Sequence, residues 1–309
     1  MKDLEKVMTG TASSSRGFTD VHVHLYDKRF GATPEEVAVY LERARSHGVV
    51  RFVCATASPA DWNRTADLAR RFPGVYPSFG VHPWNCKRVS DGWLAPLANF
   101  LDGYVANDGN TKAALGEVGL DFAVRDCTDE LRDAQEKMLR DQLKLADERK
   151  IPVTLHSVRA NERVLDIMRD YRNVPAWLLH GWRATTPEIE RAVELGAFFS
   201  FSARSVAANA LASRECVAKV PRDRILLESD GPTQLPPNGY MLQPGEKTRQ
   251  TVAPQFRDDD GFLLAEPASL LKTASEVAKI RRAPVDEFFR QLSVNERRFF
   301  ANWPKKDKE

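Results

Sequence analysis

The feature that most constrains the fold of this chain is a regular alternation of short apolar runs with longer amphipathic stretches. Eight runs rich in β-branched and aromatic residues are predicted to be strands, at 18–24, 49–55, 74–81, 112–119, 151–156, 174–180, 197–202 and 224–229. Helical patterns lie between them at 34–47, 59–72, 128–150, 187–195 and 206–220, and two more follow near 267–281 and 284–300. Strands that alternate with helices favour a parallel sheet.

Eight such units in about 250 residues match a closed barrel of parallel strands. We therefore predict an α/β fold, a (β/α)8 TIM-type barrel that forms a single domain over 18–302 with closing C-terminal helices. An open doubly wound sheet is the alternative, but no G-x-G-x-x-G sequence follows the first predicted strand. A flexible leader is expected over 1–17, and a long loop with several prolines over about 231–266.

The composition favours a globular enzyme. The formal net charge of +2 gives no strong attraction of the whole chain toward nucleic acid, although local basic loops could still act. The four cysteines show no C-x-x-C spacing, which favours reduced thiols. No apolar stretch approaches the roughly 18 residues that span a bilayer. We expect a cytoplasmic protein, with the nucleus as a second location and no membrane partner; the oligomeric state stays open.

Ionisable side chains gather where the predicted strands end. Six of them are His22, His24, Glu117, His156, His180 and Asp230. In a barrel the C-terminal ends of the strands converge on one face, where enzymes of this fold place their active sites. Any one histidine could instead be a satisfied core or loop residue. Burying all six without a counter-charge would be costly, and a bound cation would remove that cost.

The size of this donor set favours more than one metal ion. His22 and His24 project from the same face of a strand and could bind one ion together. Four imidazoles and two carboxylates exceed the three protein ligands of a typical mononuclear catalytic zinc, whereas two ions that share a carboxylate would use them all. We expect two divalent ions, Mg2+, Mn2+ or Zn2+, which would activate a water molecule.

Several segments resemble the TatD-like metal-dependent deoxyribonucleases of the amidohydrolase superfamily. They run in the family's order from about residue 18 to 295, and they are Thr19–Leu25, Gly80–Trp84, Leu115–Asp121, Gln135–His156, His180–Trp182 and Ile225–Pro232. The Gly-Glu-x-Gly-Leu-Asp and Leu-Glu-Ser-Asp sequences are the most specific. The resemblance implies a (β/α)8 fold, divalent metal dependence and hydrolysis of phosphodiesters, commonly as a DNA exonuclease acting on single strands or 3′ ends.

The resemblance also implies roles for individual residues. The ligands would be His22, His24, Glu117 and Asp230 for one ion, and Glu117, His156 and His180 for the other. Asp230 would also orient or deprotonate the attacking water. Asp230 and Glu117 are therefore the candidate catalytic residues.

Three further residues are predicted to bind substrate: His82, Arg159 and Arg183. His82 follows the third strand and could donate to the scissile phosphate or brace the site. The two arginines follow strand ends and could pair with phosphate oxygens. Arg159 lies three residues after His156, where the family has an arginine two residues after this histidine. The family often has His-x-Phe-Ser-Gly after the sixth strand, where this chain has His180-Gly181-Trp182-Arg183. Both departures are closer to a eukaryotic side branch, some members of which are described as partners of a cell-cycle protein.

The rim of the predicted site holds other candidates. Trp84 and Trp182 could stack on a base, and packing of the rim is the interpretation that we favour. Arg125 and Arg204 also follow strand ends, where each is either a phosphate ligand or a solvated charge.

Two other functions stay open. Related barrels hydrolyse small amides, lactones or phosphate esters, and many bridge two ions with a carboxylated lysine. Here Glu117 takes the bridging place and Lys112 lies at the opposite end of its strand, which favours the nuclease. A non-catalytic partner protein is the third reading, and the intact ligand set argues against it. The sequence does not determine which metal is bound, whether the substrate is DNA or RNA, or whether cleavage starts from an end or occurs internally.

Overall fold

A computed structural model of the chain describes residues 17–104, 112–233, 265–301 and 303. Its centre is an eight-stranded sheet in which consecutive strands pair in parallel and in chain order. The strands are β1 (Phe18–Val23), β2 (Val49–Ala55), β3 (Val75–Phe79), β4 (Ala114–Asp121), β5 (Val153–Val158), β6 (Trp177–Leu179), β7 (Phe198–Phe201) and β8 (Ile225–Leu227). The predicted (β/α)8 barrel is thereby confirmed.

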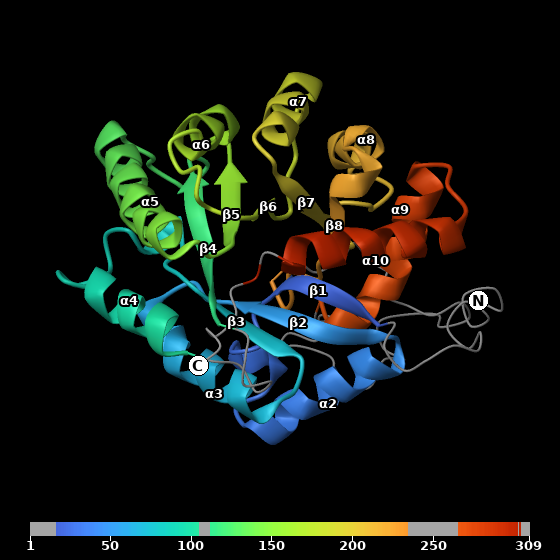
Figure 1. Cartoon of the computed structure of the whole chain (residues 1–309), viewed down its shortest axis with the longest axis horizontal. Coiled ribbons are helices and arrows are strands. Elements are labelled where there is room, and N and C mark those ends of the chain that lie inside the picture. Colours follow the sequence, from blue (N-terminus) through green and yellow to red (C-terminus); the bar gives the residue numbers. More distant parts are fainter. Residues whose placement is uncertain (1–16, 105–111, 234–264, 302, 304–309) are drawn as a thin grey trace.

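Helices surround the strands (Figure 1). They are α2 (Pro34–Ser46), α3 (Pro59–Arg71), α4 (Leu94–Gly103), α5 (Asp129–Arg149), α6 (Asn161–Met168), α7 (Thr186–Glu194), α8 (Leu211–Lys219), α9 (Leu270–Ile280) and α10 (Val285–Ala301). Short 3-10 turns lie at η1 (Lys28–Phe30), η2 (Pro83–Asn85), η3 (Arg222–Arg224) and η6 (Pro267–Ser269).

The local sequence explains where several helices begin. The Thr33 hydroxyl accepts a hydrogen bond from the backbone N–H of Glu36 at 3.3 Å, and the Glu36 carboxylate accepts one from the Thr33 N–H at 3.0 Å. Ser58 and Thr185 cap α3 and α7 in the same reciprocal way, with proline in the first turn. Helices α4 and α6 were not among the predicted ones, and both lack a side-chain cap. Their starts therefore carried no sequence signal.

One predicted helix is shorter than expected. The pattern over 206–220 predicts a continuous helix, but α8 begins only at Leu211. The backbone N–H of Ala210 donates to the carbonyl of Ala207, which makes a turn, and the Arg214 guanidinium donates to the carbonyl of Val206 at 2.6 Å. The carbonyl that would open a longer helix is therefore already used by a side chain.

Strands β4 and β5 end two residues later than predicted, at Asp121 and Val158. Glu117 and His156 therefore lie inside their strands and not at the ends. Gly119 makes this pairing feasible: its φ is +149°, and a Cβ atom there would lie 2.0 Å from the carbonyl oxygen of His156. The close approach of β4 to β5 brings the side chains of Glu117 and His156 together.

The barrel closes between β1 and the segment that follows β8. The backbone N–H of Asp230 donates to the carbonyl of His22 at 3.0 Å, and the N–H of His24 donates to the carbonyl of Gly231 at 2.8 Å. Helix α10 packs on both β1 and β8, so the last helices close the ring as predicted. The same hydrogen bonds hold Asp230 beside His22 on β1 and His24 just after β1.

Two predicted segments lie largely outside the described residues: the leader 1–17, of which only Gly17 is described, and the loop 231–266, of which only the ends are described. The domain boundaries 18–302 stay a prediction. Among the described residues, no helix combines the length and the apolar character needed to cross a membrane.

Candidate metal centre

The predicted ligand side chains meet at the C-terminal end of the barrel. Three lie on strands β1, β4 and β5, and three follow the ends of β1, β6 and β8; in this order they are His22, Glu117 and His156, then His24, His180 and Asp230. All of them are buried except His156, which is partly buried. The six positions are therefore one cluster, as their places on the strands predicted.

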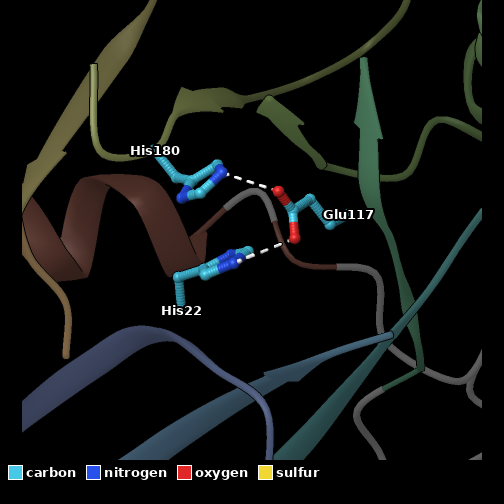
Figure 2. A group of neighbouring side chains, drawn as sticks. All are labelled: His22, Glu117 and His180. Atoms are coloured by element: carbon cyan, nitrogen blue, oxygen red, sulfur yellow. Dashed lines mark ion pairs between the residues drawn. The ribbon is translucent and has the colours of Figure 1, made fainter. Parts of the chain in front are cut away.

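Glu117 contacts imidazoles through both of its carboxylate oxygens, and Figure 2 shows two of them, His22 and His180. Its Oε2 atom lies 3.4 Å from Nε2 of His22 and 3.7 Å from Nε2 of His24. Its Oε1 atom faces three other nitrogens: Nε2 of His180 at 2.7 Å, Nδ1 of His156 at 2.9 Å and Nε2 of His82 at 3.3 Å. The two oxygens thus face two different sets of imidazoles, which is the arrangement that a bridging carboxylate requires.

Asp230 lies on the Oε2 side of Glu117. Its Oδ1 atom is 3.3 Å from Nε2 of His24 and 3.8 Å from Nε2 of His22. Four groups of three donors have their ligand atoms within 4.8 Å of one another: His22 with His24 and Asp230, His22 with Glu117 and His180, His82 with Glu117 and His156, and His180 with Glu228 and Asp230. The groups overlap, so the cluster has room for cations at neighbouring positions.

Hydrogen bonds outside the cluster orient two of the imidazoles. Nδ1 of His24 donates to the carbonyl of Ala55 at 2.8 Å, because a carbonyl can only accept, and this turns Nε2 toward the carboxylates. Nδ1 of His82 accepts from the backbone N–H of Trp84 at 3.2 Å. In neutral His82 the proton is therefore on Nε2, the atom that faces Glu117.

A buried carboxylate beside His156 was not singled out as a site residue from the sequence. Asp121, at the end of β4, is 4% exposed, and its Oδ2 atom lies 3.4 Å from Nε2 of His156. The same oxygen accepts a hydrogen bond from Nε1 of Trp84 at 2.6 Å. Asp121 lies four residues after Glu117, so strand alternation places both on the same face of β4. This spacing could have identified it.

Two more buried carboxylates lie behind the cluster. Glu228 is fully buried, its Oε2 atom accepts from the Ser200 hydroxyl, and that oxygen lies 3.7 Å from Nδ1 of His180. Asp20 is also fully buried and accepts from the backbone N–H of Ser229 at 2.9 Å. Glu228 and Asp20 each precede a predicted ligand by two residues, and period-two spacing was again the available signal.

The donor set fits divalent cations. Both ring nitrogens of His22 and Nδ1 of His180 are buried without a hydrogen-bond partner among the described residues. Buried polar atoms are normally paired, because an unpaired one costs free energy. Imidazole nitrogens with carboxylate oxygens are the usual ligands of zinc and of related transition ions. These atoms could therefore be satisfied by metal ions.

The charges of the cluster support the same conclusion. Burial would raise the pKa of the Glu117 carboxyl, but the imidazoles of His180, His82 and His22 hold it well below its usual range. Burial would lower the pKa of His24, but the carboxylates of Asp230 and Glu117 raise it to about 9. Burial, with the nearby His180 ring, lowers the pKa of His22. When no cation is bound, protonated imidazoles therefore balance the negative charge of these carboxylates, and a bound cation could take the place of those protons.

The predicted substrate-binding residues divide into two groups. His82 is 5% exposed and belongs to the cluster itself. Arg159 and Arg183 are exposed at the rim, and neither guanidinium makes a hydrogen bond or ion pair within the described part of the chain. Arg183 lines a cavity of about 490 Å³ between α7 and α8.

The two rim tryptophans also differ. Trp182 is 1% exposed and its Nε1 donates to Oδ1 of Asn161 at 2.8 Å, which confirms the packing interpretation. Trp84 is 60% exposed, so packing was the wrong interpretation for its ring. Its indole N–H donates to Asp121, and its ring packs edge-to-face against the ring of His82.

Comparison with known proteins identifies relatives over nearly the whole chain. A model of the family "TatD related DNase" matches residues 19–301. A "3'-5' ssDNA/RNA exonuclease TatD" from Erwinia tasmaniensis is 28% identical over 284 residues, which cover 91% of this chain and 98% of the relative. A "Deoxyribonuclease TATDN3" from Homo sapiens is 26% identical and covers 92% of this chain and 94% of its own.

The fold has solved counterparts as well. The crystal structure of YjjV, a TatD homologue from Escherichia coli K12, matches with a TM-score of 0.77 at 26% identity and covers 92% of this chain and 98% of its own. The curated description of YjjV is "Uncharacterized metal-dependent hydrolase", and its sequence is 27% identical over 90% of this chain and 95% of its own.

Proposed function

This chain belongs to the family of TatD related DNases, and from that membership and the geometry of the cluster we propose that it is a divalent-metal-dependent hydrolase of phosphodiester bonds in DNA. The observation that carries the proposal is the position of Glu117, whose two oxygens face separate sets of imidazoles at 2.7 to 3.7 Å. A carboxylate placed in this way can serve two ions at once.

The proposed ligands follow from these contacts. His22, His24, Glu117 and Asp230 would hold one ion, and Glu117, His156 and His180 would hold the other. Mg2+, Mn2+ and Zn2+ are the candidates, and the imidazole-rich donor set favours the transition ions. When bound, such cations supply Lewis acidity, which makes water a stronger acid and stabilises negative charge on phosphoryl oxygens.

The protein's own groups then manage the proton. Burial opposes ionisation of Asp230, but the hydrogen bond with His24 and the nearby His180 and His22 lower its pKa, so Asp230 is a carboxylate at neutral pH. The Thr233 hydroxyl, 3.2 Å from Oδ1, helps to fix it. Asp230 accepts the proton of the attacking water as the new P–O bond forms and the bond to the departing sugar oxygen breaks.

His82 has a separate role in this proposal. Its Nε2–H lies at the edge of the cluster, and its Nδ1 is fixed by the backbone of Trp84. Burial lowers the pKa of His82, so the ring is neutral and donates a hydrogen bond without adding a positive charge. It orients a phosphoryl oxygen, while Arg159 and Arg183 at the rim attract the strand.

The substrate class rests on the relatives. The Erwinia tasmaniensis relative is named for single-stranded DNA and RNA and for cleavage from 3′ to 5′, and the human relative is named for DNA. We propose single strands and 3′ ends as the substrates of this chain. The position of Lys112 argues against a small-molecule hydrolase that needs a carboxylated lysine between its two ions. Lys112 precedes β4 and therefore lies at the end of the barrel opposite the cluster.

The experiment is a metal analysis joined to activity assays. Chelator-treated protein is reconstituted with Mg2+, Mn2+ or Zn2+ and tested on a labelled single strand, the matching duplex, RNA, a lactone, an amide and a simple phosphate ester. We expect about two ions per chain and cleavage of the single strand. Glu117→Gln should abolish cleavage, whereas Glu287→Gln, an exposed carboxylate on α10, should not.

Three results would overturn the proposal in different ways. Fewer than one ion per chain would exclude the two-metal site. Turnover of the lactone, amide or ester alone would favour a small-molecule hydrolase. Binding of DNA without cleavage by any metal form would favour a non-catalytic partner protein.

A further inference from the structure

A cavity of about 380 Å³ opens beside the metal centre, and the mechanism above does not use it. Trp84, Arg88, Asp121 and Arg125 line it. Its size lies within the range of small-molecule and nucleotide pockets. Asp121 belongs to both places, because its Oδ2 atom lies 3.4 Å from Nε2 of His156. A group bound in the cavity would therefore lie next to Asp121, one imidazole away from the Oε1 atom of Glu117.

Trp84 forms an exposed aromatic wall of this cavity. Its ring is 60% exposed, whereas Trp62, Trp177, Trp182 and Trp303 are all at most 5% exposed. The ring is nevertheless fixed: its Nε1 donates to Asp121 at 2.6 Å, and its centroid lies 4.6 Å from that of His82. An apolar face that is held in place but left in water is a ready platform for stacking.

The same wall carries positive charge. Arg88 is exposed, and its guanidinium makes no hydrogen bond or ion pair with any residue that the structure describes. The Arg125 side chain is 95% exposed and lies 3.8 Å from Asp126, which is a weak surface contact. The acid that lines the cavity, Asp121, is already paired with Trp84 and His156. Two guanidinium groups are thus free to meet an anion.

We infer that this cavity is a nucleotide subsite of the metal centre, in which an unpaired base stacks on Trp84 while Arg88 and Arg125 contact the adjoining phosphates. The inference rests on the proposed nuclease function and assigns it a strand-recognition site. Stacking needs an open base face, which a duplex covers with neighbouring pairs. The subsite therefore selects single-stranded nucleic acid over duplex.

The test uses the fluorescence of Trp84 and the affinity for oligo(dT). Full-length Asp230→Asn protein loaded with Mn2+ keeps the strand intact during titration, and chelator-treated wild type provides a second measurement. We expect oligo(dT) to quench part of the tryptophan emission. Trp84→Phe should lose this quenching but keep most of the affinity, because a phenyl ring still stacks. Trp84→Ala should bind about tenfold more weakly, roughly 1.4 kcal/mol.

An abasic strand separates stacking from a general effect of the substitution. A chain of tetrahydrofuran phosphates has the same backbone but no bases. Wild type and Trp84→Ala should bind it equally. If Trp84→Ala weakens abasic and normal strands alike, or if duplex binds as tightly as single strand, the subsite is excluded.

The arginines are tested by salt dependence. Each phosphate contact contributes about 0.7 to the slope of log K against log salt for a single strand. Arg88→Gln with Arg125→Gln should therefore reduce that slope by about 1.4. The matched control is Arg222→Gln with Arg290→Gln, two exposed arginines near and on α10, which should leave the slope unchanged. If the slope of log K against log salt is the same in both double variants, Arg88 and Arg125 do not contact the phosphates.

The results also distinguish failure of the subsite from failure of the proposed function. If oligo(dT) quenches the tryptophan emission and Trp84→Ala binds it tenfold more weakly, but wild-type protein cleaves no strand with any metal, the subsite is retained and the nuclease function is rejected. If wild-type protein cleaves the strand, but oligo(dT) quenches no tryptophan emission and Trp84→Ala has an unchanged KM, the nuclease function is retained and the subsite is rejected.

Discussion

The imidazoles of His22 and His180 stack face to face, with ring centroids 4.0 Å apart and planes inclined by 14°. One ring comes from β1 and the other from the residue after β6, and each directs Nε2 to a different oxygen of Glu117, at 3.4 and 2.7 Å (Figure 2). Two charged imidazoles at this distance would repel each other. Burial and the nearby His180 ring lower the pKa of His22, which favours its neutral form, whereas for His180 burial is outweighed by the Glu117 carboxylate beside the two rings, which raises the pKa of His180 and balances its charge.

The first prediction concerns Glu117. Because its two oxygens face different donor groups, Glu117→Ala should weaken metal binding at both positions, by about tenfold or more at each. His24→Ala removes a donor from one group only, since His24 occurs with His22 and Asp230, and should weaken mainly one position. Calorimetric titration of Mn2+ into chelator-treated protein measures both. If Glu117→Ala also weakened only one position, Glu117 would not bridge the two ions.

The second prediction concerns Asp230. Asp230→Asn is nearly isosteric, so the fold should survive, but the amide cannot accept the proton of the attacking water. We expect kcat to fall by about 10² to 10⁴ while DNA binding changes much less. Single-turnover cleavage of a 3′-labelled oligonucleotide in excess metal is the measurement, with a thermal melt as the folding control. Cleavage within about threefold of wild type, roughly 0.65 kcal/mol in the barrier, would refute the assignment.

The third prediction concerns Glu228, which lies beside His180 and shares a group of three donors with His180 and Asp230. Its Oε2 atom lies 3.7 Å from Nδ1 of His180, and its Oε1 atom is buried without a hydrogen-bond partner among the described residues. Glu228→Gln keeps the size but removes the charge that polarises the imidazole. We expect metal affinity to fall by about tenfold, the low end for partners of ligating histidines.

Calorimetry distinguishes this positioning role from a general loss of structure. Glu228→Gln should lower the affinity at the position that contains His180 and leave the other position within twofold. Ser200→Ala removes the hydroxyl that donates to Glu228 without removing the charge, and it should have a smaller effect. Equal losses at both positions would show that Glu228 only supports the fold.

The fold could be predicted from the sequence because its signals are local and repeated. Reciprocal caps at Thr33, Ser58 and Thr185 mark helix starts, and the alternation of runs gives the barrel. The gathering of the predicted ligands at one end of the barrel followed from the same logic, since the C-terminal ends of parallel strands converge. The ends of β4 and β5 could not be predicted in this way. They depend on the contact of Gly119 with the carbonyl of His156, which lies 37 residues later in the chain, and no local sequence signal marks this contact.

The surroundings of the site were harder to predict for a physical reason. Asp121 and Glu228 share strand faces with predicted ligands, but whether a carboxylate on that face is a ligand, a partner of a ligand or a solvated charge depends on neighbouring strands. Trp84 and Trp182 both follow strand ends and looked equivalent. Trp182 is buried against Asn161 and Phe199, whereas Trp84 is exposed, and this difference depends on residues far away in the sequence.

The last prediction is a pH dependence that does not involve the metal centre. Glu266, just before η6, is 3% exposed and lies 3.3 Å from Nη2 of Arg43 on α2. Burial raises its pKa from 4.5 to about 7, although Arg43 and Lys272 act in the opposite direction. The folded protein therefore holds this proton more tightly than the unfolded chain. Its stabilising contribution is complete below pH 4.5 and is lost as the pH rises to about 7.

Removing the titrating group should remove this loss. Glu266→Gln stays neutral and keeps the size, so the free energy of unfolding of wild type should fall relative to this variant, on the order of 3 kcal/mol between pH 4.5 and 7. Urea unfolding of chelator-treated protein at pH 5 and pH 7 measures the difference, and Glu42→Gln, an exposed position on α2, is the control. If wild type and Glu266→Gln change equally between the two pH values, then Glu266 is ionised in the folded protein throughout, and its pairing with Arg43 outweighs the burial of the charge.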